Sequence, residues 1–150
     1  MRIEYLPDDM RAIRQVAGWL HAEFGHRSRG STLETRIQRI CKRAQRRALP
    51  LAFIARENVS IVGTASLVAH DIDARLDLTP WLASVYVPPS HRKRGIGGSL
   101  CQRVVQEART LGFGRIYLFT FDKTSFYKSL GWKEIQQRKY HREDVTIMAL

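Results

Sequence analysis

The sequence predicts a single α/β domain over residues 1–150, a mixed β-sheet with helices on its faces. Three observations predict it. The 150 residues contain no repeat and no low-complexity tract, and this length is typical of one domain. Amphipathic segments with helical spacing alternate with short apolar, β-branched runs typical of strands. Glycine and proline mark the boundaries between them, which gives the order β-α-α-β-β-β-α-β-α-β.

The first third of the chain is predicted to form one strand and two helices. Residues 2–5 form the strand, and Asp8 or Asp9 provides the side-chain cap of the helix that follows. Ser31 and Glu34 have the spacing of a capping box, which predicts the start of the second helix. Basic residues recur along that helix at near-helical spacing, and we expect them to form a solvated face. They are Arg36, Arg39, Arg43 and Arg46.

The remaining two thirds are predicted to supply five strands and two helices. Residues 51–56 and 61–68 are apolar runs joined by a short polar turn, as in an antiparallel hairpin. Pro88 and Pro89 end the next strand, since proline lacks the amide hydrogen that a sheet needs. That strand covers 81–87, the last two strands cover 115–121 and 145–150, and the helices cover 97–110 and 125–130.

Composition excludes some classes of protein. Hydrophobic residues make up 44% and charged residues 26%, as in globular proteins, and no apolar run reaches the roughly 20 residues of a membrane span. The N-terminus has no apolar signal segment and two cysteines are too few for a disulfide framework, so we expect a cytoplasmic protein. The net charge of +11 is compatible with nucleic acid, with a phosphorylated cofactor or with no specific partner, and charge alone does not choose between them.

A basic, glycine-rich loop between a strand and a helix carries the clearest functional signal. Its cations are Arg92, Lys93 and Arg94, and its glycines are Gly95, Gly97 and Gly98. The free amides and partial positive charge of a helix N-terminus attract phosphate, and glycines let the backbone approach the anion closely. The loop is therefore predicted to bind phosphate. A dinucleotide fingerprint fits less well, because no three-glycine pattern opens a βαβ unit, and the Lys-Ser or Lys-Thr pair of a P-loop is absent.

Three segments resemble, in order, the N-acetyltransferases of the GNAT superfamily. The cofactor motif of that family is a strand ending in Val-x-Pro, then Arg/Gln-x-x-Gly-x-Gly/Ala. This chain has Val-Pro-Pro at 87–89 and Arg-Lys-Arg-Gly-Ile-Gly at 92–97. The family's Phe-Tyr-x-x-Leu-Gly-Phe segment is similar to Phe-Tyr-Lys-Ser-Leu-Gly-Trp at 126–132, and a weaker match is Ile-Val-Gly-Thr-Ala-Ser at 61–66. The resemblance extends over nearly the whole chain.

The resemblance implies a centrally splayed sheet of the acyl-CoA N-acyltransferase type, open between the strands at 81–87 and 115–121. The pantetheine arm of the co-substrate acetyl-CoA would lie in that gap, and loop amides would hold its pyrophosphate. The implied reaction is direct attack on the thioester by a primary amine of a small molecule or a protein, without a metal. The implied cofactor-binding residues are Val85, Tyr86, Val87, Arg92, Lys93, Arg94, Gly95, Ile96, Gly97 and Gly98.

Tyr127 is the catalytic residue that the resemblance implies. Its hydroxyl would lie near the thioester sulfur and would protonate or hydrogen-bond the leaving thiolate. The alternative is a tyrosine that only packs in the core. The family often has an asparagine a few residues earlier that contacts the cofactor, and here Asp122 or Ser125 takes that place.

The sequence leaves the general base open. The strand at 81–87 lacks the glutamate that many family members carry there. An alkyl amine loses its proton at neutral pH at a cost of roughly 4–5 kcal/mol, whereas a peptide α-amine needs only about one pH unit of deprotonation. A water relay to an acid would serve either amine. The candidates are Asp71, Asp73, Asp77, His70, Glu23 and water alone.

The same residues suggest partners and one rival function. Three acids within 71–77 precede the strand expected beside the acetyl group, and they would attract a cationic acceptor. Neither a membrane nor nucleic acid is the expected partner, and a homodimer stays open. The histidines never cluster with cysteines or acids, so no metal is expected, and Cys101 is expected to pack in the core. The rival is a non-catalytic module of the same fold that binds acyl-CoA or nucleic acid.

Overall fold

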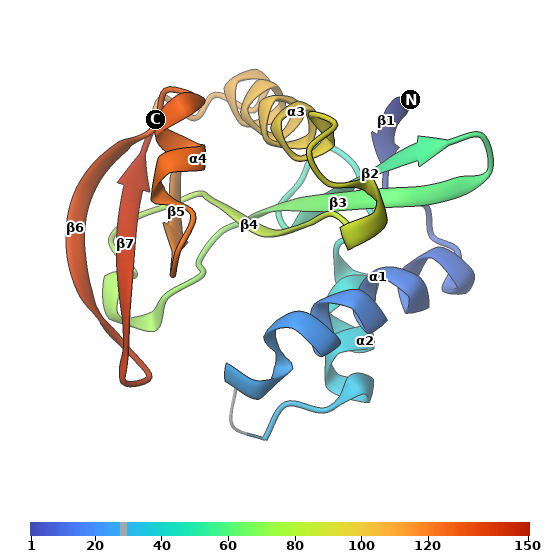
Figure 1. The fold of residues 1–150 in the computed structure, drawn as a ribbon, viewed down its shortest axis with the longest axis horizontal. Coiled ribbons are helices and arrows are strands. Elements are labelled where there is room, and N and C mark those ends of the chain that lie inside the picture. The colour runs from blue at the N-terminus through green and yellow to red at the C-terminus, as the bar shows by residue number, and fades with distance from the viewer. Residues whose placement is uncertain (28–29) are drawn as a thin grey trace.

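The computed structural model describes residues 1–27 and 30–150, and within them seven strands form one mixed sheet (Figure 1). The strands lie in the order β1-β2-β3-β4-β5-β7-β6, and each neighbouring pair is antiparallel except β4 and β5. They are Arg2–Tyr5 (β1), Leu51–Glu57 (β2), Ser60–Val68 (β3), Trp81–Tyr86 (β4), Tyr117–Thr120 (β5), Lys133–Tyr140 (β6) and Glu143–Ala149 (β7). The predicted fold class is confirmed.

Helices cover both faces of this sheet. α1 (Met10–Phe24) and α2 (Leu33–Lys42) lie below the sheet in Figure 1, and α3 (Ile96–Thr110) lies above it. On β2, Phe53 packs in the core on the α3 side, and its neighbour Ile54 packs against α1 and α2. The connections contain α4 (Thr124–Ser129) and three short 3-10 helices, η1 (Gly25–Arg27), η2 (Asp73–Arg75) and η3 (Pro89–His91). No helix in the described part of the chain is both long and apolar enough to cross a membrane.

β4 and β5 separate soon after they begin. Their register contains one pair, Trp81 opposite Tyr117, whereas β5 and β7 share four pairs. Figure 1 shows β4 running away from β5 toward the start of α3. Beyond Trp81, the edge of β4 that faces β5 therefore has no strand partner within the described residues. The central splay that the resemblance implied is confirmed.

The sequence-based order contains six strands and omits β6. Along this strand only Gln136, Arg138 and Tyr140 are half-buried, and the intervening residues are exposed. A central strand would need apolar residues at alternate positions. β6 lies at the edge of the sheet and pairs only with β7, and a polar edge strand is compatible with that position.

Two helix starts can be compared with their predicted caps. Asp9 caps α1, accepting a hydrogen bond from the Arg11 amide at 3.0 Å. The predicted box of Ser31 and Glu34 is wrong, because α2 begins at Leu33, one residue later than that pair requires. Thr32 and Thr35 form the capping box instead, with reciprocal bonds of 3.0 and 3.1 Å.

The basic residues of α2 do not form the solvated face that was predicted. Arg39 and Arg46 are exposed, but Arg36 has only 7% of its surface exposed and Arg43 is half-buried. Both lie on the side of α2 that packs against the sheet, where polar side chains of β3, β4 and the β3–β4 loop accompany them. Helical spacing alone does not distinguish this buried polar patch from a solvated face.

Candidate active site

The N-terminus of α3 presents backbone amides. Gly95 is its N-cap and has a φ of 80°, a left-handed conformation that favours glycine. No side chain caps this helix among the described residues, so the amides from Ile96 to Gly98 lack a capping acceptor. A β-carbon on Gly95 would meet no atom within 4 Å, which indicates open space beside the loop. Free amides at the positive end of a 15-residue helix suit a phosphate.

The three cations of the loop are engaged differently. Arg92 Nε donates to the carbonyl oxygen of Val87 at 2.8 Å and so ties the loop to the end of β4. Arg94 forms an ion pair with Glu57, at the end of β2. Lys93 is exposed and forms no ion pair with the residues that the structure describes. Of the three, Lys93 therefore has its charge available for a ligand.

Three predicted elements meet at Gly97. A β-carbon there would lie 3.7 Å from Phe126 Cζ on α4 and 3.8 Å from Val87 Cγ2, just after β4. A β-carbon on Gly98 would lie 3.7 Å from Leu130 Cδ2. The fold thus brings together the end of the strand, the glycine-rich loop and the segment that contains Tyr127.

β4 contains a bulge next to the predicted pantetheine-binding residues. Thr64 of β3 lies opposite Tyr86. Two residues further along β3, Ser66 lies opposite Ala83, so β4 has one residue more than β3 in this interval. Ser84 within it has a φ of 55°, a left-handed conformation that non-glycine residues rarely adopt. Such strain persists only where surrounding contacts hold it.

Arg43, directly after α2, supplies contacts that hold the bulge. Its Nη1 donates to Ser66 Oγ and to Ser84 Oγ, each at 3.0 Å. Burial lowers the pKa of the Arg43 guanidinium to about 10, so the group stays charged at neutral pH. A hydrogen bond from a charged donor contributes about 1.5–3 kcal/mol. Arg43 therefore fixes the residue that directly precedes Val85, a role that the sequence did not indicate.

Tyr127 lies in α4 with 8% of its surface exposed. Its ring meets the rings of Phe126 and Trp132 edge-on, with centroids 5.0 and 6.3 Å away. Burial raises the pKa of the Tyr127 phenol above its ordinary value of 10.0. The phenol is therefore protonated at neutral pH and keeps a proton that it can donate.

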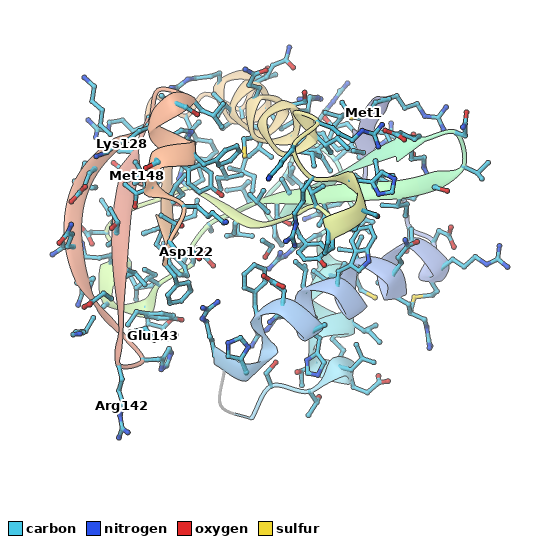
Figure 2. All side chains as sticks on the ribbon, in the orientation of Figure 1. Met1, Asp122, Lys128, Arg142, Glu143 and Met148 are labelled. Atoms are coloured by element: carbon cyan, nitrogen blue, oxygen red, sulfur yellow. The ribbon has the colours of Figure 1, made fainter. Side chains whose placement is uncertain are left out.

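Asp122 and Ser125, the two candidate contacts in place of the family's asparagine, lie where β5 passes into α4. Both residues are exposed, and Figure 2 labels Asp122 at this junction. The Lys123 amide donates to Thr120 Oγ1 at 2.9 Å, and this bond shapes the turn from β5 to α4. Their position next to the helix of Tyr127 is compatible with a role at the cofactor.

Asp71 has the most perturbed carboxyl group among the candidate bases. Burial raises its pKa to about 6, from an ordinary 3.8, and the positive charges of Arg43 and Arg36 oppose that rise. At pH 7 the carboxyl is still mostly ionised, and it is a stronger base than an exposed aspartate. It lies three residues after the end of β3, near Arg43.

The other candidate bases are less favourably placed. Arg75 donates to both carboxylate oxygens of Asp77, at 3.0 and 2.9 Å, and this partner lowers the pKa of Asp77. Asp73 and His70 are exposed in the loop, and Glu23 is exposed on α1. With Asp77 paired and Asp71 desolvated, the acidic segment presents Asp73 as its one exposed, unpaired carboxylate within the described residues. Its predicted attraction for a cationic acceptor is weaker than three acids imply.

A cavity of about 430 Å³ lies between η1 and the β6–β7 hairpin, where the sequence indicated no site. His26, Arg27, His141 and Glu143 line it. Arg27 Nε donates to Glu143 Oε2 at 3.0 Å, and its guanidinium lies 3.9 Å from the centre of the Phe121 ring. Figure 2 labels Glu143 near the tip of this hairpin. The Arg27–Glu143 contact joins residues 116 positions apart, so no local sequence pattern predicts it.

Covalent catalysis by Cys101 is disfavoured. This cysteine is 1% exposed on α3, and burial raises the pKa of its thiol to about 12. The thiolate is the nucleophilic form, so the thiol is unreactive at neutral pH. Across residues 1–27 and 30–150, no three His, Cys, Asp or Glu side chains gather as the ligands of a metal ion would.

Comparison with known proteins gives one family. The family model described as the acetyltransferase (GNAT) family matches residues 13–132. This interval contains the glycine-rich loop, the β4 bulge and Tyr127. No curated protein matches the sequence.

Solved structures share the fold over the whole chain. An aminoglycoside 6'-N-acetyltransferase complexed with coenzyme A is 17% identical, with a TM-score of 0.78 over 100% of this chain and 96% of that one. A Salmonella typhimurium structure with its cofactor acetyl-CoA is 22% identical, with a TM-score of 0.74 over 99% and 92%. A ribosomal-protein-alanine N-acetyltransferase from Brucella melitensis is 20% identical, with a TM-score of 0.74 over 100% and 99%. At these identities the likeness concerns the fold.

Proposed function

The chain belongs to the acetyltransferase (GNAT) family, and from this premise we propose that it transfers acetyl from acetyl-CoA to a primary amine of a small molecule or a protein. One observation carries the proposal: the end of β4, the uncapped start of α3 and the helix of Tyr127 meet at Gly97. The splay beyond Trp81 leaves a strand edge open beside that meeting point.

The chain offers matching groups for each part of acetyl-CoA. The backbone of Val85, Tyr86 and Val87 would pair with the pantetheine amides, because β4 has no partner on its β5 side beyond Trp81 within the described residues. The amides from Gly95 to Gly98, together with Lys93, would hold the pyrophosphate. Asp122 or Ser125 would contact the cofactor from the other side of the gap. When bound, acetyl-CoA supplies the activated acetyl thioester.

Tyr127 is proposed as the residue that assists departure of the thiolate. Its raised pKa keeps the phenol protonated, so the hydroxyl can donate a hydrogen bond or a proton as negative charge develops on sulfur. Its ring is fixed by Phe126 and Trp132, which limits the positions that the hydroxyl can take. The transfer then needs no covalent enzyme intermediate, because the acceptor nitrogen attacks the thioester directly.

Asp71 is proposed as the acid that receives the amine proton, directly or through water. Its pKa of about 6 makes it a better match to an amine at neutral pH than the paired Asp77. We further propose that the cavity beside Arg27 and Glu143 admits the acceptor. We also propose a cytoplasmic location, since both cysteines are free thiols.

The proposal is tested by measuring thiol release from acetyl-CoA across a panel of amines. The panel contains amino acids, their amides, diamines, aminoglycosides and peptides with free N-termini. We expect amine-dependent thiol release with at least one class and a matching acetylated product by mass spectrometry. Binding of acetyl-CoA without release for any amine would indicate the rival function, a non-catalytic acyl-CoA-binding module.

A further inference from the structure

Arg36 is buried and Arg43 is half-buried on the α2 side of the sheet, and Asp71 adds a carboxylate to the same region. Arg36 and Arg43 are seven residues apart, about two helical turns, so both project from the same side of α2. Asp71 approaches them from the β3–β4 loop. Burial lowers the pKa of both guanidinium groups and raises that of Asp71. The charge of Asp71 opposes this effect at Arg36 and at Arg43, and both arginines oppose it at Asp71, so the carboxylate lies near both guanidinium groups.

Within the described residues, Asp71 does not pair with either arginine, and Arg36 has a donor without a partner. No ion pair within 4.0 Å joins Asp71 to Arg36 or Arg43. In the part of the chain that the structure describes, Arg36 Nε is buried without a hydrogen-bond partner. Arg43 bonds to Ser66 and Ser84 through Nη1 alone. Arg36 therefore has a buried donor that no group in the described part of the chain satisfies, and Asp71 does not pair with it.

The charge balance indicates what kind of partner would satisfy this donor. Two guanidinium groups oppose one carboxylate, and a buried cation without an anion is strongly unfavourable. A guanidinium offers planar, parallel N–H donors whose geometry matches a carboxylate. Arg36 Nε and the unused nitrogens of Arg43 are such donors. The missing partner is therefore an anion, and a carboxylate fits the donors.

The location connects this anion site to the proposed reaction. Arg43 contacts Ser84, the residue directly before Val85. The proposed function places Val85 along the pantetheine arm, and consecutive Cα atoms are about 3.8 Å apart. An anion held by the two arginines would therefore lie within reach of a short molecule whose amine is at the thioester.

We propose that Arg36 and Arg43 bind a carboxylate of the acceptor, and that the acceptor is a small, amino acid-like molecule carrying both an amine and a carboxylate. This inference rests on the proposed function, since it names the substrate class of the same site. An inorganic anion such as phosphate or chloride would also match the two arginines, and the experiment distinguishes it from a carboxylate of the acceptor.

The first arm uses the wild-type protein and matched acceptors. Thiol release from acetyl-CoA is measured with free amino acids and with the corresponding amino acid amides, which differ only at the carboxylate. We expect kcat/KM to be at least about tenfold higher for the acids, because a hydrogen bond to a charged group contributes about 1.5 kcal/mol or more. Amides or diamines that react as well as the acids would overturn the proposal. Inhibition by phosphate or chloride in that case would mean that the arginines bind an inorganic anion only.

The second arm uses Arg36→Gln with Arg39→Gln as the matched control, since Arg39 is exposed on the same helix. We expect Arg36→Gln to raise KM for amino acids about 10- to 100-fold, with kcat and the turnover of amides little changed. Arg39→Gln should change KM by less than about twofold. If Arg36 is purely structural, Arg36→Gln will lower the melting temperature and will change the kinetics with acids and with amides equally. That result would contradict the proposal.

The two proposals fail in different ways. If no amine releases thiol from acetyl-CoA, the proposed function fails and the acceptor class fails with it. If amides, diamines or peptides react and free amino acids do not, the acetyltransferase stands and only the carboxylate site is wrong. Should Arg36→Gln not fold, the acid-to-amide ratio of the wild-type protein alone decides.

Discussion

The two sides of the gap beyond β4 present different chemical groups, backbone amides on one side and charged side chains on the other. The proposed cofactor side, residues 85–98 with 122–132, presents backbone amides, glycines and one tyrosine. The proposed acceptor side consists of α2, the β3–β4 loop, η1 and the β6–β7 hairpin, and it presents charged side chains that are partly removed from water, such as Arg43 and Asp71. One side comes from two short segments, and the other from several segments that are far apart in the chain.

Under the proposed function, this difference predicts that binding of the cofactor tolerates side-chain changes that binding of the acceptor does not. Backbone amides at a helix N-terminus recognise phosphate whatever the neighbouring side chains are. Side-chain charges recognise one acceptor, and a single substitution alters them. The chain shares the family motif at 92–97, whereas Arg36, Arg43 and Asp71 belong to the part that no motif describes. The following experiments test that division.

The largest effect is expected on the cofactor side, from Tyr127→Phe. The change removes the hydroxyl and keeps the ring against Phe126 and Trp132. If the phenol assists thiolate departure, kcat should fall about 10²–10⁴-fold, with acetyl-CoA affinity nearly unchanged. Steady-state kinetics and the melting temperature measure the two effects. Tyr117→Phe, which removes a hydroxyl from β5, is the control and should keep its turnover.

Unchanged turnover in Tyr127→Phe would remove the phenol from the mechanism. An unfolded variant would instead make Tyr127 a core residue whose hydroxyl is needed for structure.

On the acceptor side, Asp71→Asn should produce a pH-dependent effect. If Asp71 receives the amine proton, kcat/KM of the wild type rises with pH through about 6, and Asp71→Asn lowers kcat/KM and removes that rise. Asp73→Asn, two residues away and exposed, is the control. A pH profile that keeps its inflection in Asp71→Asn would assign the base to water or to another acid.

Stability should respond to Asp71 with a defined sign. The folded-state pKa of about 6 lies above the ordinary 3.8, so the folded protein retains a proton that the unfolded chain releases between these pH values. The charged carboxyl therefore lowers the free energy of unfolding as pH rises through this window. Relative to the wild type, Asp71→Asn should gain at most about 1.4 kcal/mol per pH unit across it. Urea unfolding at pH 4, 5 and 6 measures this gain, and a difference that does not change with pH would contradict it.

Arg43→Met should weaken the bulge by a smaller amount. Methionine retains an apolar stem but loses the bonds to Ser66 and Ser84. Each of the two lost bonds contributes about 1.5 kcal/mol or more, and removal of a desolvated charge offsets part of the loss, so the free energy of unfolding should fall by about 2 kcal/mol. Urea unfolding measures the loss, and Lys42→Met, exposed one position earlier, is the control. Equal stability of the two variants would mean that the bulge forms without Arg43.

The smallest effect is expected where the charge is solvated. Replacing the exposed Arg39 and Arg46 by glutamine should leave acetyl transfer to a small amine within a few fold of the wild type. Any affinity for duplex DNA should be weak and should fall steeply with salt. Tight, sequence-dependent binding at physiological salt would make nucleic acid the primary partner.

The cofactor side could be predicted from the sequence because its signals are local. Pro88 and Pro89 end a strand, Gly95 begins a helix, and the loop between them needs no distant residue to be recognised. The alternation of strands and helices also predicts the sheet. β6 was not predicted, because an edge strand needs no apolar face. Its half-buried positions are Gln136, Arg138 and Tyr140, which do not form an apolar alternation.

The acceptor side could not be predicted because its contacts are not local. Arg43 and Ser84 are 41 residues apart, and nothing near either one indicates the other. Helical spacing shows that Arg36 and Arg43 share a face, but it does not show whether that face meets water or the sheet. Only the packed structure reveals that Arg36 is buried and Arg43 half-buried.

The most direct test of the central claim is whether acetyl-CoA stabilises the protein through the start of α3. A ligand at about 100 times its dissociation constant adds about 2.7 kcal/mol to the free energy of unfolding, so acetyl-CoA should raise the melting temperature of the wild type. Gly97→Glu places negative charge at the phosphate and should abolish the shift. Gly97→Ala is the control for folding, because its β-carbon would make ordinary contacts at 3.7 and 3.8 Å. No shift of the wild type at millimolar acetyl-CoA, or an equal shift in Gly97→Glu, would contradict the account.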